Sequence, residues 1–230
     1  MKSLTLNRNS AQLALLQRIE LADDNLRKIR KIFGRYLFSK VFSKYFINIK
    51  KISENYSRIM NEELDTIKKF ISDKKSFLSI GAGIGGLELL VLKTIINSHV
   101  TFIEKNYVSD KIRYGWDSSN REGYNDLNQL DNLLKKNEIS KDRYKIFDFD
   151  KKNFPIDNFD ILLSIYSLDY HYDFEIYSNY LRRVMNKESI LIFDTIRPKH
   201  FERVFKHVEI IKEDLNTVHK SKRIVCRSFK

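Results

Sequence analysis

The chain has 230 residues, a mass of 27.5 kDa and 42 basic against 30 acidic side chains, for a net charge of +12. This length suits one domain with an appendage, or two small domains, that can fold without a disulfide or a metal. The single cysteine, Cys226, excludes an intramolecular disulfide framework and predicts a reducing, cytoplasmic location. No apolar run approaches the ~20 residues of a membrane-spanning helix, and residues 1–14 show no signal-peptide pattern.

The positive charge is concentrated near the N-terminus. Residues 25–51 hold nine basic side chains and no acidic one: Arg27, Lys28, Arg30, Lys31, Arg35, Lys40, Lys44, Lys50 and Lys51. Such a block favours an anionic partner, such as a nucleic acid, a sugar nucleotide, a phosphorylated lipid or a membrane surface. The alternative is a solvated helix face in a chain whose overall composition is rich in lysine.

Residues 1–72 form the first predicted unit, a helical extension. Apolar side chains recur there at helical spacing, which predicts three or four helices with breaks near Asp23 and around Ser53. An aromatic stripe within it, Phe38, Phe42, Tyr45 and Phe46, predicts packing against the following domain. The extension has three alternative roles: a lid over a substrate, an RNA-binding surface, or the interface of a homodimer.

Residues 73–230 form the second predicted unit, in which short apolar strands alternate with helices. Strands are expected at residues 76–80, 100–103, 143–147, 159–165, 189–193, 208–211 and 223–226. Helices are expected at residues 86–96, 124–136, 174–185 and 198–205. This alternation predicts an α/β domain with a Rossmann-like, mostly parallel seven-stranded sheet covered on both faces. The last two strands have a short connection and should pair as an antiparallel hairpin.

A glycine-rich turn follows the first of these strands. Residues 77–87 read FLSIGAGIGGL, so a buried strand runs into glycines and a helix begins at once. Glycines there permit a tight turn and close backbone approach to a nucleotide, and the helix N-terminus supplies free N–H groups. Glu104 lies at the end of the next strand, where its carboxylate could accept hydrogen bonds from both ribose hydroxyls of an adenosine.

The glycine spacing fits two kinds of cofactor. Gly81, Gly83 and Gly86 satisfy the pattern of FAD-binding monooxygenases, whereas Gly81, Gly83 and Gly85 satisfy that of class I S-adenosylmethionine-dependent methyltransferases. A flavin enzyme of that type would need several hundred further residues and a distal Gly-Asp segment. Only 144 residues follow Gly86, without such a segment. The methyltransferase pattern therefore fits better.

Further segments resemble the same methyltransferase family over about residues 60–230. Residues 148–150 (DFD) and 154–164 (FPIDNFDILLS) are similar to the end of its third strand and to its fourth strand. Residues 190–194 (ILIFD) are similar to its fifth. The family usually has an acidic residue two positions before the first glycine, where this chain has Ser79, so a contact from Ser79 to the methionine moiety is uncertain.

The resemblance implies that S-adenosylmethionine is the cofactor and implies which residues bind it: Ser79, Gly81, Ala82, Gly83, Gly85, Glu104, Lys105, Asp148, Phe149, Asp150, Ser164 and Ile165.

His171 follows the fourth strand and, with a pKa near working pH, is the candidate general base. Asp169 would orient it or bind a substrate hydroxyl. Tyr166, Tyr172 and Trp116 are candidate substrate contacts, each with ordinary packing as the alternative. No cluster has convincing metal-ligand spacing, so no metal is expected.

Motifs that the sequence lacks restrict the class of molecule that could accept the methyl group. No Asn/Asp-Pro-Pro-Tyr/Phe motif follows the fourth strand, which argues against amino methylation of adenine or glutamine, and no nearby cysteine could attack a pyrimidine. Residues 114–127, His171, Tyr172 and Tyr177 are loosely similar to sugar O-methyltransferases of surface-polysaccharide pathways. The expected function is thus O-methylation of a small molecule or a sugar or glycan hydroxyl. The alternatives are an RNA methyltransferase, a non-catalytic nucleotide-binding module, or a flavin or nicotinamide protein.

Overall fold

The computed structural model describes residues 3–108, 123–151, 153–170, 172–213 and 220–230. The helices are α1 (Arg8–Gln17), α2 (Asp24–Leu37), α3 (Ser43–Tyr45), α4 (Ile49–Ile71), α5 (Gly86–Thr94), α6 (Leu127–Lys136), α7 (Glu175–Val184) and α8 (Pro198–Phe201), with short turns η1 (Ile19–Leu21), η2 (Phe38–Phe42), η3 (Lys141–Arg143) and η4 (Phe149–Lys151). The strands are β1 (Ser76–Ile80), β2 (His99–Glu104), β3 (Tyr144–Asp148), β4 (Ile161–Ser164), β5 (Ile190–Thr195), β6 (Phe205–Glu213) and β7 (Lys222–Phe229).

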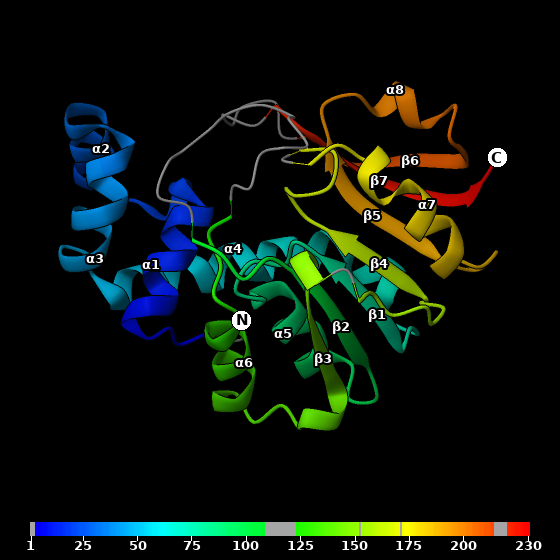
Figure 1. Ribbon diagram of the computed structural model, residues 1–230, viewed down its shortest axis with the longest axis horizontal. Helices are drawn as coiled ribbons and strands as arrows, with labels where there is room; N and C mark the ends of the chain where they lie inside the picture. Colours follow the sequence, from blue (N-terminus) through cyan, green and yellow to red (C-terminus); the bar gives the residue numbers. More distant parts are fainter. Residues whose placement is uncertain (1–2, 109–122, 152, 171, 214–219) are drawn as a thin grey trace.

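The strands form one seven-stranded sheet in the order β3-β2-β1-β4-β5-β7-β6 (Figure 1). Strands β1 to β5 are parallel, and β7 pairs antiparallel with both β5 and β6. The predicted mixed sheet and its C-terminal hairpin are therefore confirmed. A dinucleotide-binding Rossmann sheet has the order 3-2-1-4-5-6, so the antiparallel β7 inserted beside β5 separates this chain from that class.

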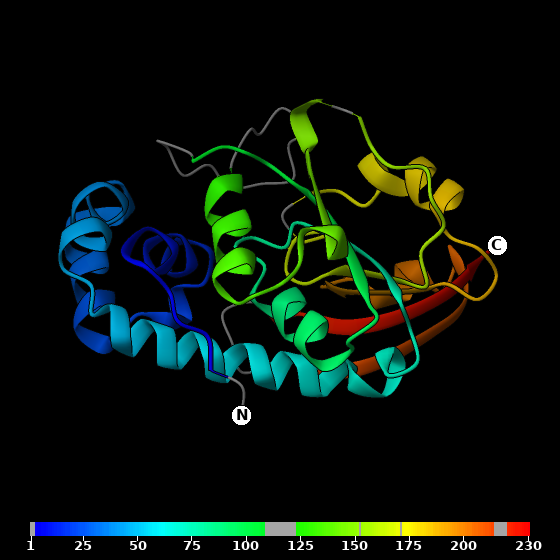
Figure 2. The ribbon, with the colours of Figure 1, turned by 90° about the horizontal axis from the view of Figure 1, so that it is seen from below.

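Each face of the sheet packs on its own set of helices. Because side chains alternate along a strand, Phe77 of β1 packs with α4, α5 and α6, whereas Leu78 packs on the opposite face with α7 and α8. Helix α4 runs beneath the sheet and links it to the N-terminal helices (Figure 2). One hydrophobic cluster contains side chains from α1, α4, α5 and the sheet, so the N-terminal segment shares the core of the domain.

The break predicted around Ser53 is wrong. Helix α4 continues through that position, and the actual boundary is Asn48, whose side chain caps the helix by accepting a hydrogen bond from the Lys51 N–H at 3.0 Å. Ser53 is buried instead, and its hydroxyl accepts from the Leu6 N–H at 3.2 Å. The predicted break near Asp23 is confirmed, because α2 begins at Asp24.

The described residues include no helix that is both long and apolar enough to cross a bilayer.

Candidate functional site

The glycine loop lies between the end of β1 and the start of α5. Gly81, Gly83 and Gly85 have φ values of +71°, +61° and +76°, a region that side-chain-bearing residues rarely adopt. A Cβ added to Gly81 would lie 2.0 Å from the Ser167 hydroxyl oxygen. The three glycines with left-handed backbone are thus those of the methyltransferase spacing. Gly86 already has helical geometry, and a Cβ there would instead meet the Tyr56 hydroxyl at 2.3 Å.

Glu104, at the end of β2, binds this loop directly. One carboxylate oxygen accepts from the Gly83 N–H at 2.6 Å, and the other accepts from the Lys105 N–H at 2.8 Å. Burial raises the pKa of Glu104 to about 7, and the two backbone N–H groups oppose that rise only in part. The site therefore holds a carboxyl group that changes charge near neutral pH and is bonded to the backbone of the glycine loop.

A small cavity opens next to Glu104. It is lined by Gly81, Ile103, Glu104, Lys105, Phe149, Ser167, Tyr172 and Tyr177. The Lys105 ammonium lies 5.4 Å from the ring centre of Phe149 and 5.1 Å from that of Tyr172. Aromatic faces that can hold a cation can also stack on a planar base. The structure brings Gly81, Glu104, Lys105, Phe149 and Tyr172, all predicted from the sequence, to one cavity.

Three other predicted residues, Asp148, Asp150 and Ser164, lie at or just after the ends of β3 and β4 but do not line the cavity. Asp148 lies in register with Glu104, and its side chain accepts from the Asp150 N–H at 3.1 Å. Asp150 is exposed. The buried Ser164 donates its hydroxyl to the Ile80 carbonyl at 2.8 Å and accepts from the Leu168 N–H at 2.9 Å. Ser164 thus holds the loop after β4 against β1.

Three side chains that the sequence did not single out hold the glycine loop from outside. Gln17, at the end of α1, donates to the Tyr124 carbonyl at 2.7 Å and accepts from the Ile84 N–H at 3.3 Å. Asn125 donates to the Gly83 carbonyl at 2.7 Å. The buried Tyr56 hydroxyl accepts from the Gly86 N–H at 3.1 Å.

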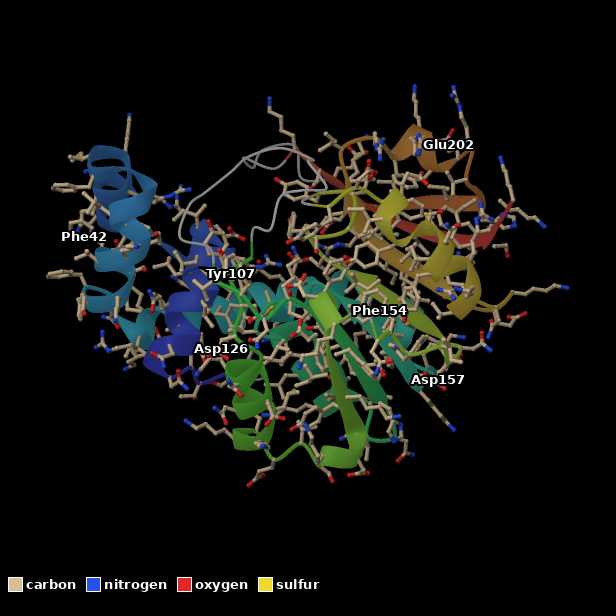
Figure 3. The ribbon with its side chains drawn as sticks, viewed as in Figure 1. Phe42, Tyr107, Asp126, Phe154, Asp157 and Glu202 are labelled. Atoms are coloured by element: carbon tan, nitrogen blue, oxygen red, sulfur yellow. The ribbon has the colours of Figure 1, made fainter. Side chains whose placement is uncertain are left out.

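Figure 3 shows that the segment holding Asn125 lies on the side of the sheet facing α1, where Tyr107 and Asp126 are labelled. The N-terminal helices therefore form part of the wall of the site.

Ser79 is paired with an acidic residue that the sequence analysis missed. Its hydroxyl donates to the Glu88 carboxylate at 2.6 Å, and both side chains are buried. Burial raises the pKa of Glu88, which Ser79 opposes, and its second carboxylate oxygen has no partner among the described residues. Helix α5 thus supplies, through Glu88, a carboxyl group beside Ser79, the position at which the methyltransferase family usually has an acidic residue. The second carboxylate oxygen of Glu88 keeps its capacity to accept a hydrogen bond.

The loop after β4 is held in an unusual backbone conformation. Tyr166 and Asp169 have φ values of +56° and +58°, which cost energy in residues that carry side chains. The Tyr166 N–H donates to Asp194 at 3.1 Å, and the Arg18 guanidinium lies 5.0 Å from the Tyr166 ring centre. Ile165 packs against the core of the α4–α5 face.

Asp169 is buried and engaged on both carboxylate oxygens. It accepts from the Thr195 hydroxyl at 2.6 Å and from Arg197, whose Nη2 lies 2.6 Å from Oδ1. These contacts fix the backbone next to position 171. His171 and Trp116 lie outside the described residues, so their predicted roles stay predictions.

A buried ionic network joins the N-terminal helices to the far strands of the sheet. Arg223 on β7 donates two hydrogen bonds to Asp194 at 3.0 Å each and one to Glu63 on α4. Arg18 and Lys212 also contact Glu63, at 3.5 and 3.3 Å. Burial opposes ionisation of Glu63, but Arg223 and Arg18 lower its pKa to about 2. Since Asp194 also binds the Tyr166 N–H, this network supports the loop after β4.

Among the described residues, no His, Cys, Asp and Glu side chains gather in a group of three or more that could hold a metal.

Solved structures of methyltransferases are similar to this chain. A candidate O-methyltransferase from Nostoc punctiforme PCC 73102 matches with a TM-score of 0.54 and 12% identity, over 79% of this chain and 58% of that one. The candidate methyltransferase yhhF from Escherichia coli matches with a TM-score of 0.50 and 15% identity, over 75% and 88%. Mitomycin 7-O-methyltransferase MmcR has a TM-score of 0.49 and 16% identity, over 78% and 58%.

The chain spans 58% of the length of the first and third of these proteins. No protein family and no curated protein sequence matches it. At such low identities, the two matches with TM-scores of 0.54 and 0.50 establish the fold alone, in agreement with the strand order and the glycine loop. The chain has the fold of the class I S-adenosylmethionine-dependent methyltransferases.

Proposed function

We propose that the chain is an S-adenosylmethionine-dependent methyltransferase that methylates a hydroxyl group of a small molecule or a sugar or glycan. The main support for the proposal is that three features lie next to one another: the glycine loop with its left-handed backbone, the Glu104 carboxylate bound to that loop, and the cavity with aromatic walls beside both. The loop keeps its left-handed backbone because Ser167, Gln17 and Leu130 pack where a Cβ would lie, and Glu104 provides the acceptor that ribose hydroxyls need.

The described residues fit the parts of this cofactor in turn. Glu104 would hold the ribose, while Lys105, Asp148 and Phe149 would surround the adenine. Tyr172, which the sequence predicts as a substrate contact, lines the same cavity as Glu104 and Phe149, so we assign it to the adenine instead. The backbone of residues 81–83 would face the methionine part, together with Ser79, Ser164 and Ile165. Glu88 is itself buried and holds the Ser79 hydroxyl at 2.6 Å, so it would act on that end through Ser79.

The bound cofactor supplies an electrophilic methyl group on a sulfonium centre. The protein has to align a hydroxyl with it, exclude water and remove the hydroxyl proton. We assign proton removal to His171 and treat Asp169 as a positioning residue, because its own oxygens are bound to Thr195 and Arg197. Tyr166 and Trp116 would contact the acceptor. The single cysteine, which is buried, supports a cytoplasmic reaction.

Cofactor binding should depend on pH through Glu104. Its pKa is raised to about 7, so the group is mostly protonated at pH 6 and mostly ionised at pH 8. Only the ionised form accepts from both ribose hydroxyls, so affinity for S-adenosylmethionine should rise about tenfold between these pH values. Glu104→Gln, of the same shape, should bind weakly with no such rise. Isothermal titration at both pH values measures this, and an unchanged slope in Glu104→Gln would remove Glu104 from the ribose site.

The acceptor class can be tested with radiolabelled methyl donor. We expect methyl transfer to hydroxyl-bearing sugars or nucleotide sugars, and we expect the product methyl ether to survive the alkaline conditions that hydrolyse methyl esters of carboxylic acids. The edge-to-face pair of Tyr166 and Tyr170, with ring centres 5.7 Å apart, offers an aromatic surface of the kind that packs on sugar rings. Transfer to RNA alone, with a steep salt dependence, would contradict the proposal of a sugar acceptor.

A further inference from the structure

The N-terminal helices include a segment with unusual surface chemistry, which we call the arm: α2, η2 and α3, residues 24–46. It projects from one end of the molecule, away from the sheet, in both ribbon views (Figures 1 and 2). Gly34, with φ of +75°, breaks the helical backbone in its middle. The rings of Phe33 and Phe42 then pack at 5.1 Å across the break. Figure 3 labels Phe42 at this end and Glu202, the residue after α8, at the other.

The arm exposes large apolar side chains. Six of the thirteen large apolar residues exposed in the described part of the chain lie on it: Ile32, Phe33, Leu37, Val41, Tyr45 and Phe46. Ile32 is 74% exposed and Phe46 65%. The aromatic stripe predicted to pack against the next domain is therefore only partly buried, with Phe38 inside and Tyr45 and Phe46 outside. A cluster of exposed apolar residues marks a surface that meets another partner.

Basic side chains alternate with these apolar ones. Leu37, Val41 and Tyr45 recur every four residues, and Lys40 and Lys44 run beside them with the same spacing. Since residues four apart share a helix face, the two rows lie next to each other. Lys28 lies four residues before Ile32, so these two side chains share one face of α2. All of these side chains are exposed, and residues 25–51 contain no acidic residue.

We infer that the arm is a docking surface for a membrane that contains anionic phospholipids. Helical segments that lie in a bilayer interface combine exposed apolar side chains, which enter the acyl boundary, with lysines and arginines that meet acidic headgroups. Charge complementarity selects this occupant. A second copy of the chain would bring its own basic block against this one, and a nucleic acid would leave Ile32, Leu37 and Val41 in water.

The test is co-sedimentation of the full chain with two kinds of vesicle, phosphatidylcholine alone and phosphatidylcholine mixed with phosphatidylglycerol. We expect binding to the mixed vesicles only, and we expect it to weaken as salt is added. The double variant Ile32→Ser, Tyr45→Ser should bind at least about tenfold more weakly. Both positions are exposed, so circular dichroism should show an unchanged fold.

A matched control uses two equally exposed isoleucines away from the arm. Ile96 is 77% exposed and Ile156 78%, so Ile96→Ser, Ile156→Ser removes similar apolar area and should leave vesicle binding unchanged. The inference is overturned if the wild type ignores both kinds of vesicle, or if the two double variants lose binding equally. It is also overturned if the arm variant instead dissociates a dimer or abolishes RNA binding while vesicle binding persists.

Discussion

Gly81→Ala is expected to abolish binding of S-adenosylmethionine, with a loss of at least about a hundredfold in affinity, or ~3 kcal/mol. The new methyl group would lie 2.0 Å from the Ser167 hydroxyl oxygen and 2.4 Å from its Cβ, both in the wall of the cavity. Ser167 is buried, so it cannot move aside without displacing the loop after β4. The measurement is isothermal titration of the variant with S-adenosylmethionine.

The chain offers a matched control for the backbone strain in this variant. Gly34 has φ of +75°, close to the +71° of Gly81, but a Cβ there would meet no atom within 4 Å. Gly34 has ψ of 169°, a conformation essentially restricted to glycine, so Gly34→Ala should lower folding stability through backbone strain alone and leave cofactor binding unchanged. Wild-type affinity in a folded Gly81→Ala protein would show that the ligand does not approach this loop.

Glu63→Gln is expected to lower the free energy of unfolding by about 3–5 kcal/mol, because it removes the buried carboxylate that Arg223, Arg18 and Lys212 share and leaves these cations with one carboxylate fewer in the core. Glu63 is 2% exposed and Arg223 1%. The comparison is Glu209→Gln, which removes the exposed ion pair between Lys69 and Glu209 at 3.0 Å. That variant should change the free energy of unfolding by less than about 1 kcal/mol. Urea denaturation followed by circular dichroism measures both.

The difference in unfolding free energy between the wild type and Glu63→Gln should depend on pH. Because the pKa of Glu63 in the folded protein is about 2, below its ordinary value of 4.5, the ionised carboxylate stabilises the fold above pH 4.5. This contribution should be lost as the pH falls from 4.5 towards 2. The difference in unfolding free energy between wild type and Glu63→Gln should therefore shrink over that range. A constant difference would show that the network does not depend on the charge of Glu63.

The parts of the fold that depend on local sequence were predictable. The strand at residues 76–80, the glycine loop and the break before Asp24 all follow from short patterns, because apolar runs, glycines and helix caps act over a few residues. The same reasoning failed at Ser53, which looks like a boundary by type. Its hydroxyl is used by the N–H of Leu6 in another segment, and such a contact leaves no local signal.

The parts of the site that depend on distant contacts were not predictable. Gln17 reaches Tyr124, 107 residues away, and Arg223 meets Glu63 across 160 residues. Glu88 is the exception that could have been found. It lies nine residues after Ser79 on the helix that follows the loop, so an acidic side chain in the first turn of that helix was a readable signal. Looking only for an acidic residue on the strand concealed it.

Titration calorimetry of the wild-type protein, with S-adenosylmethionine, S-adenosylhomocysteine, FAD and NAD as separate ligands, determines which cofactor the glycine loop binds. We predict micromolar dissociation constants for the first two and no binding heat with FAD or NAD, because the sheet order and the glycine spacing are those of a methyltransferase. Absence of binding by both S-adenosyl compounds, with FAD or NAD bound instead, would contradict this prediction.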